Sequence, residues 1–175
     1  LVDIGRADVD LARTRCGPTP LYIAAQEGHV EIVRYLVQTG GADVNKAAHN
    51  GRNPLYAAAR DGHLDVVKVL VQTGGGDANK PDHRGSTPLY VAAQHGHLDV
   101  IKFLVRVCKA DVNSKNKLGA TPLHAAMDRG HTEVVKFLIR NGAQDTECTR
   151  KDTGETANVG DLANKMGDQT LTDYV

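Results

Sequence analysis

The sequence predicts an all-α fold, a solenoid of helix-turn-helix units with projecting, β-hairpin-like turns. The first observation is a repeated phrase that begins at Thr19, Asn53, Thr87 and Thr121, at intervals of 34 residues. Each copy continues with Pro-Leu and small apolar residues, and each is followed by a Gly-His pair and a second apolar segment. Repetition at such a period is typical of one supersecondary unit stacked along a line.

The second copy of the phrase indicates how the first helix of each unit begins and ends. Asn53 can cap a helix, Pro54 suits its first position, and Gly62 suits a left-handed stop, so we expect a helix over residues 54–61. Threonine occupies the capping position in the other three copies. Because its hydroxyl can accept the same hydrogen bond, the exchange should keep the capping chemistry.

Helical spacing gives each predicted helix one apolar face. In the second copy it turns Leu55, Ala58 and Ala59 inward, while Ala57 and Asp61 point away. A second helix is expected over residues 63–71. Its predicted core face comprises Leu64, Val67, Leu70 and Val71, with Asp65 and Lys68 outside.

Segments rich in Asp, Asn and Gly separate the units and predict the projecting turns. We expect a single domain, 1–175. It divides into the end of a preceding repeat at 1–11, four repeats at 12–45, 46–79, 80–113 and 114–147, and a degenerate capping repeat at 148–175. In the last unit, residues 154–157 resemble the start of a first helix. Residues 1–10 resemble 36–45, which leads us to expect a piece of a longer protein.

Composition excludes several classes of protein. Lys plus Arg and Asp plus Glu number 21 each, so net charge favours no nucleic-acid partner. No apolar run approaches the roughly 18 residues of a membrane span, and no signal peptide is visible. The three cysteines, Cys16, Cys108 and Cys148, are odd in number and scattered, unlike a secreted disulfide scaffold. We expect a monomer in a reducing, intracellular setting, cytoplasmic or nuclear.

The order Gly-x-Thr-Pro-Leu-x-x-Ala-Ala, Gly-His and Ala-Asp-Val-Asn resembles the ankyrin repeat. The resemblance covers roughly residues 7–145. Two departures stand out. Tyr22, Tyr56 and Tyr90 occupy a position where the family usually has His, which only His124 keeps. The period also exceeds the family's usual value of about 33 because an extra residue such as Gly41 lengthens the turn.

No group of residues satisfies the needs of a metal site or a catalytic centre. A metal needs converging ligands, but the histidines of the Gly-His pairs recur one repeat apart along the solenoid axis. We therefore expect each of them to bond locally to loop backbone, and we predict no cofactor. His95, His97, Asp99 and Cys108 lie near one another in sequence, but no strained nucleophile turn or oxyanion nest accompanies them. We predict that the chain is not an enzyme.

Two further sets of residues have both a structural and a functional interpretation. By resemblance to the family, Asn45, Asn79 and Asn113 tie the loops by hydrogen bonds, and in some members such residues are targets of an asparaginyl hydroxylase. The rings of the three tyrosines either space neighbouring repeats or form an aromatic ridge for a ligand. In both cases we favour the structural interpretation and leave the other open.

The turn tips, which we define as residues 12–18, 46–52, 80–86, 114–120 and 149–155, are basic. They carry ten basic residues against three acidic ones. The basic residues are Arg13, Arg15, Lys46, Arg52, Lys80, Arg84, Lys115, Lys117, Arg150 and Lys151. Since the whole chain is neutral, the remainder must be acidic, and such a segregated field would steer an acidic partner toward the tips.

The family resemblance implies a protein-protein interaction module that recognises its partner through the turn tips and the ends of the first helices. We expect a partner with an acidic or extended surface. From the tips, the predicted site comprises Arg15, Cys16, Pro18, His49, Asn50, Arg52, His83, Arg84, Ser86, Lys117, Leu118 and Ala120. From the first helices it comprises Gln26, Glu27, Arg60, Asp61, Gln94, His95, Asp128 and Arg129.

Two other functions stay open. The same basic edge could bind phosphate-bearing ligands, either nucleic acid or anionic lipid headgroups. With two Phe and no Trp, the chain offers no aromatic platform among the basic residues for single-strand binding. The array could also be a passive targeting arm for a catalytic domain outside these residues.

Overall fold

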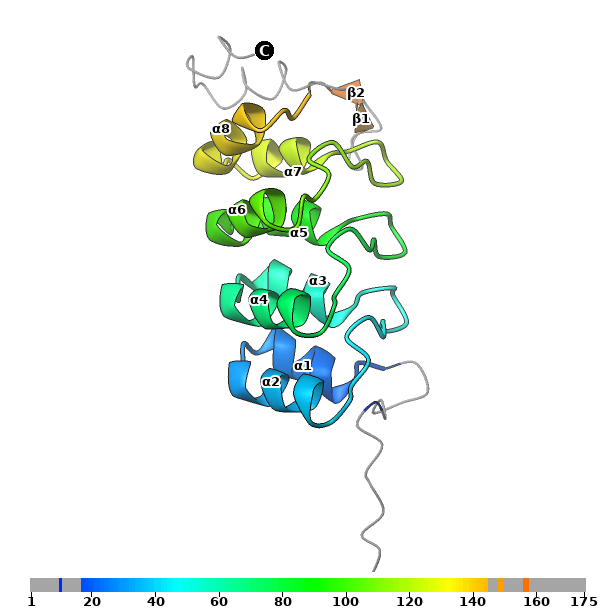
Figure 1. Cartoon of the computed structure of the whole chain (residues 1–175). Helices are drawn as coiled ribbons and strands as arrows, with labels where there is room; N and C mark the ends of the chain where they lie inside the picture. Colours follow the sequence, from blue (N-terminus) through cyan, green and yellow to red (C-terminus); the bar gives the residue numbers. More distant parts are fainter. Residues whose placement is uncertain (1–9, 11–16, 145–147, 150–155, 158–175) are drawn as a thin grey trace, which may run out of the picture.

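The computed structural model describes residue 10, residues 17–144, and the short segments 148–149 and 156–157. Over this part of the chain, helix pairs stack one above another, and a turn projects to the same side of each pair (Figure 1). The helices are α1 (Pro20–Gln26), α2 (Val30–Gln38), α3 (Pro54–Asp61), α4 (Leu64–Gln72), α5 (Pro88–His95), α6 (Leu98–Arg106), α7 (Pro122–Asp128) and α8 (Thr132–Arg140). The predicted all-α solenoid is confirmed.

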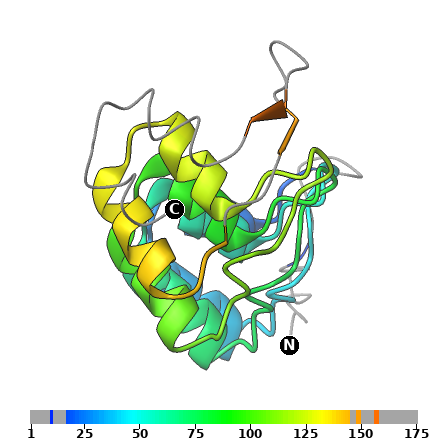
Figure 2. The same ribbon diagram turned by 90° about the horizontal axis from the view of Figure 1, so that it is seen from above.

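The helices form two layers, as the view along the stack makes clear (Figure 2). The first helices of the repeats, α1, α3, α5 and α7, contact one another in sequence and lie beside the turns. The second helices, α2, α4, α6 and α8, form the other layer. The apolar core runs between the layers and continues through all four repeats. Among the described helices, none is both long and apolar enough to cross a lipid bilayer.

Each first helix begins as the sequence predicts. Thr19 Oγ1 accepts the backbone N–H of Tyr22 at 3.1 Å, and Asn53 Oδ1 accepts that of Tyr56 at 2.8 Å. Proline follows the cap in all four helices. The predicted boundaries of the helix Pro54–Asp61 are confirmed, and Gly62 ends it with a φ of 81°.

The predicted outward orientation of Ala57 is wrong, because this side chain is fully buried at 0% exposure. The corresponding Val91 and Ala125 are also buried, at 2% and 5%. Helix α3 has α1 on one side and α5 on the other, and α4 packs against it as well. An inner helix in such a stack therefore buries nearly its whole circumference, which a single apolar stripe does not predict.

The second helix of this repeat starts one residue later than predicted and buries a different set of residues. His63 is the N-cap, and α4 extends to Gln72. Val67 and Leu70 lie in the core as expected, but Leu64 and Val71 are only partly buried. The side chains buried in addition are Val66 and Val69. Because α4 packs on α2 as well as on α3, its core face is wider than one repeat alone requires.

In the first helix pair, α1 and α2, the side chains at the equivalent positions are exposed. Ile23, Ile32 and Tyr35 are 39%, 51% and 63% exposed. They occupy the positions at which Ala57, Val66 and Val69 of the next repeat are buried. Since α1 and α2 pack against α3 and α4, these positions are covered in the second repeat, whereas Ile23, Ile32 and Tyr35 remain accessible apolar side chains.

The side chains of His63, His97 and His131 bond to the preceding repeat rather than locally, contrary to prediction. His63 Nε2 donates to the carbonyl of Gln26 at 2.9 Å, and His97 Nε2 donates to that of Arg60 at 2.8 Å. Both acceptors belong to the preceding repeat. The glycine of the preceding repeat's pair makes room for the ring, because a Cβ added at Gly62 would lie 2.6 Å from His97 Nδ1. The recurrent Gly-His pair is thus a contact between successive repeats.

The C-terminal unit also differs from prediction at residues 156–157. Instead of starting a helix, β2 (Thr156–Ala157) pairs antiparallel with β1 (Cys148–Thr149), with Cys148 opposite Ala157. Alanine stands here where proline begins the other first helices, so no ring presets the helical backbone angle. The rest of the predicted capping repeat lies outside the described residues.

The cap at Asn53 yields a prediction about stability. Its side chain is 1% exposed, and its Nδ2 has no hydrogen-bond partner among the described residues. Asn53→Thr keeps the capping oxygen and removes this buried donor, so it should raise the free energy of unfolding by about 1 kcal/mol. Urea denaturation followed by circular dichroism measures the change. The reverse exchange at the equally buried Thr19, Thr19→Asn, should lower stability; a gain there would contradict the explanation.

Candidate functional site

The turn tips are joined to one another by backbone hydrogen bonds. Within a tip, the N–H of Asp82 donates to the carbonyl of Ser86 at 2.9 Å. Between tips, His83 N–H donates to Asn50 O at 3.0 Å, and Lys117 N–H donates to Arg84 O at 2.9 Å. The predicted hairpin-like turns of repeats 2 to 4 therefore form a continuous, hydrogen-bonded edge along the solenoid.

Two glycines permit this close approach of successive tips. Gly51 and Gly85 have φ angles of 80° and 81°, in the left-handed region. A Cβ at Gly51 would lie 2.7 Å from the backbone nitrogen of His83. A Cβ at Gly85 would lie 3.1 Å from the backbone nitrogen of Lys117. Any side chain here would be strained, and at Gly51 it would collide with backbone of the next tip.

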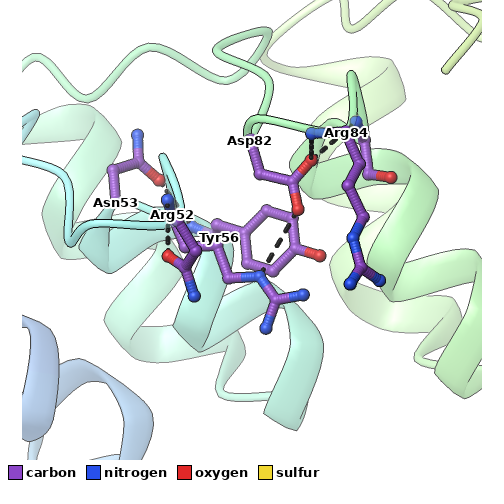
Figure 3. Close-up of polar contacts among 7 residues, drawn as sticks. Arg52, Asn53, Tyr56, Asp82 and Arg84 are labelled. Atoms are coloured by element: carbon purple, nitrogen blue, oxygen red, sulfur yellow. Dashed lines mark hydrogen bonds and ion pairs between the residues drawn. The ribbon is translucent and has the colours of Figure 1, made fainter. Parts of the chain in front are cut away.

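Asp82 stabilises the third tip and connects it to the second. Its Oδ1 accepts the N–H groups of Arg84 and Ser86 at 2.8 and 3.0 Å. Its Oδ2 accepts from Arg52 Nε at 3.4 Å, and the side chain is only 2% exposed (Figure 3). In the fourth tip Asn116 Oδ1 makes the equivalent turn bonds, to the N–H groups of Leu118 and Ala120. The ion pair with Arg52 is thus an extra contact, present between the second and third tips and not required for the turn itself.

Arg52 also covers the ring of Tyr56, its guanidinium carbon 5.0 Å from the ring centroid. Burial raises the pKa of Tyr56 to about 12, with Arg52 lowering it and Asp82 raising it to smaller extents. The tyrosine is therefore a neutral, 4% exposed spacer between repeats. This favours the structural interpretation of the tyrosines at Tyr56, and Tyr22 is similarly buried at 7%.

A groove of about 390 Å³ lies between the tips and the first helices. Its walls come from α3, α5 and the tips of repeats 2, 3 and 4. It is lined by Arg52, Tyr56, Asp82, His83, Arg84, Ser86, Tyr90, Gln94, Asn116, Lys117 and Leu118. Seven predicted site residues are thereby brought together: Arg52, His83, Arg84, Ser86, Gln94, Lys117 and Leu118.

Several predicted site residues from the helix ends lie outside this groove. Arg60 and Asp61 pair with each other at 2.6 Å, and the exposed Asp128 and Arg129 approach to 3.9 Å. His95 stacks on His97 with ring centroids 6.2 Å apart, and burial, followed by the charge of His97, lowers its pKa. Gln26 and the exposed Glu27 lie at the end of α1.

The remaining predicted residues from the tips are more peripheral. Asn50 is engaged in the backbone contact with the next tip, and His49 is exposed beside it. Pro18 and Ala120 are half-buried. Arg15 and Cys16 lie outside the described residues.

Several basic side chains of the tips are engaged in hydrogen bonds or ion pairs within the protein. Lys46 Nζ donates to the carbonyl of Asp10 at 3.1 Å, and Lys80 Nζ donates to that of Asn45 at 3.0 Å. Arg52 is paired with Asp82. Within the three described tips, three basic side chains have no ionic or hydrogen-bonded partner among the described residues: Arg84, Lys115 and Lys117.

The predicted hydrogen-bonding role of the loop asparagines is confirmed, and the bonds connect neighbouring repeats. Asn45 Oδ1 accepts the N–H of Asp77 at 3.1 Å, and Asn113 Oδ1 accepts that of Gln144 at 2.8 Å. Asn79 makes the equivalent bond. The carboxylate of Asp10 accepts the N–H of Asp43 at 3.2 Å in the same manner.

Two observations concern metal and thiol chemistry in the described part of the chain. No group of three or more His, Cys, Asp or Glu side chains there is placed to hold a metal ion. The half-buried thiol of Cys108 has its pKa raised by burial, which disfavours the reactive thiolate.

Sequence reasoning missed four residues of the groove. In the sequence analysis Asp82 counts only as one of three acidic tip residues. An Asp whose oxygen can reach the N–H groups two and four residues later is nevertheless typical of a turn closed by side-chain-to-backbone hydrogen bonds. Asn116 shows the same spacing in the next tip. Tyr56 and Tyr90 belong to the predicted tyrosine ridge, not to the predicted site.

Comparison with known families identifies the repeated unit. A family model described as ankyrin repeats in three copies matches residues 1–82 and 74–152. A comparison with curated proteins gives no match.

The role of Asp82 can be tested with two substitutions. Asp82→Ala removes the acceptor of both turn bonds and of Arg52, so the free energy of unfolding should fall by about 2–3 kcal/mol. Asp82→Asn should lose only about 1 kcal/mol, because an amide oxygen can accept the turn bonds as Asn116 does and only the ion pair is lost. Chemical denaturation of both variants measures this. Equal losses of unfolding free energy in the two variants would contradict the view that the turn bonds contribute more than the ion pair.

Proposed function

The chain belongs to the ankyrin repeat family, and we propose that it is a non-catalytic module that binds a partner protein through its turn tips and concave face. Ankyrin repeats are generally protein-protein interaction modules. The observation that carries the proposal for this chain is the groove across repeats 2 to 4, which gathers seven of the residues in which the repeats differ. An intracellular location and a monomeric state stay predictions.

The groove combines a constant frame with variable side chains, as recognition of a specific partner requires. Along the frame, each tip has the same backbone bonds, and the third and fourth tips have an Asx-type acceptor, Asp82 or Asn116, at the same position. At one position of the tips the side chain changes from Asn50 to Arg84 to Leu118, and at another from Arg52 to Ser86 to Ala120. The surface therefore presents different chemistry at each repeat without altering the fold.

Binding of phosphate-bearing ligands is less well supported. High affinity for nucleic acid comes from many Lys and Arg contacts to phosphate. Half of the basic side chains of the three described tips are engaged in contacts between repeats, as described above. The groove also has apolar walls, from Tyr56, Tyr90 and Leu118, which a protein partner can cover.

Affinity capture with cross-linking tests the proposed function. The double variant Arg84→Glu, Lys117→Glu reverses two groove charges that have no described structural role, whereas Arg52 is left intact because of its contact with Asp82. The wild-type chain should capture a defined set of proteins from source cells, and the variant should capture roughly tenfold less, since complementary charges guide encounter and fix register.

The matched control is Lys102→Glu, Arg140→Glu. It replaces one Lys and one Arg as the groove variant does, but on α6 and at the end of α8, away from both the groove and the turn tips. The control should capture as the wild type does. A wild-type chain that captures no protein, or a groove variant that captures as well as the control, would refute the proposal.

A further inference from the structure

The groove contains a pair of cations that the fold places side by side. Arg84 and Lys117 come from neighbouring tips, and the hydrogen bond from Lys117 N–H to Arg84 O holds their backbones 2.9 Å apart. Both residues are exposed and line the groove. Neither side chain has an ionic or hydrogen-bonded partner among the described residues. Two basic side chains thus start from adjacent backbone positions at the groove, and the described residues do not neutralise their charges.

The one carboxylate that lines the groove does not compensate this charge. Asp82 is 2% exposed, and both of its oxygens are occupied by the backbone of its own tip and by Arg52. Figure 3 shows the Arg84 side chain extending away from this carboxylate. The uncompensated positive charge of the groove therefore faces solvent and is available to a ligand.

Apolar surface lies directly beside the two cations. Leu118 follows Lys117 in the chain and is 39% exposed, one of the few large apolar side chains that the described residues leave accessible. Tyr90 is half-buried in the same wall. A ligand that fits this combination brings a negative charge together with an apolar group.

We propose that this part of the groove binds an extended acidic segment of the partner protein, with a Glu or Asp carboxylate between Arg84 and Lys117 and an adjacent apolar side chain against Leu118 and Tyr90. Arginine presents paired donors that suit a carboxylate, and lysine adds a second positive charge. An extended strand suits the shape, because it can follow the edge formed by successive tips. The inference rests on the proposed function and specifies the chemistry of the partner.

Two defined peptides serve as probes. One is an acetylated and amidated Ser-Gly-Leu-Glu-Glu-Leu-Gly-Ser, and the other has both Glu replaced by Gln, which keeps the shape and removes the charge. Titration of the isotope-labelled chain, followed by amide chemical shifts, detects the weak binding expected of so short a peptide, with a dissociation constant on the order of 1 mM. The Glu peptide should shift the amides of residues 84, 117 and 118, and the Gln peptide should bind roughly tenfold more weakly.

Three charge variants locate the site. Arg84→Glu and Lys117→Glu should each weaken binding of the Glu peptide at least about fivefold, while Lys102→Glu, on α6 in the other helix layer, should leave it unchanged. Binding should also weaken as NaCl rises from about 50 mM to about 500 mM. Well-dispersed amide spectra of the variants separate a lost contact from a lost fold.

The results that overturn the inference are distinct from those that overturn the proposed function. Equal shifts with both peptides, shifts confined to α4 and α6, or no shifts with the Glu peptide would each refute the carboxylate site. So would a short oligodeoxythymidylate that shifts the same amides more strongly at equal concentration, because it would indicate a phosphate site. A chain that captures its partner through the groove but fails these titrations refutes only the inference.

Discussion

The packing of each repeat on its neighbour is the constraint on which the rest of this structure depends. A pair of helices of seven to nine residues cannot bury its apolar side chains alone. Small residues such as Ala57 and Ala58 let the first helices approach closely, and both are fully buried. His63 and His97, which follow Gly62 and Gly96, then each bond to a carbonyl of the preceding repeat. The sequence repeats because every junction needs the same fit.

The stacking of the helix pairs determines the arrangement of the turn tips. Once the helix pairs are in register, successive tips lie close enough for their backbones to bond, and glycine is required where they meet. The result is a firm edge whose side chains are free to differ. Arg52 and Arg84 illustrate the outcome. Arg52 connects two tips through Asp82, whereas the side chain of Arg84, also at a tip, is exposed and has no partner among the described residues.

The sequence predicts the features that arise within one repeat, but not the contacts that one repeat makes with its neighbours. Helix Pro54–Asp61, its cap and its stop follow from local rules, and so do the hairpin-like turns. The burial of Ala57, the bond from His63 to Gln26 and the widened core face of α4 each require a neighbouring repeat, which the pattern of a single unit does not contain. At the site, residue types indicated the basic tips, but charge counting could not separate Arg52 and Lys80, which are engaged in structural contacts, from Arg84 and Lys117. That separation depends on the position of Asp82 and of loop carbonyls.

Hydrogen-deuterium exchange of the chain with and without its captured partner tests the central claim most directly, because it reports on every part of the backbone at once. If the partner binds the groove, it should slow exchange in the tips at residues 80–86 and 114–120 and in the adjoining helices α3 and α5. The second helices α4 and α6, in the other layer, should exchange at unchanged rates. Slowed exchange confined to α4 and α6, with the tips unaffected, would contradict binding through the groove.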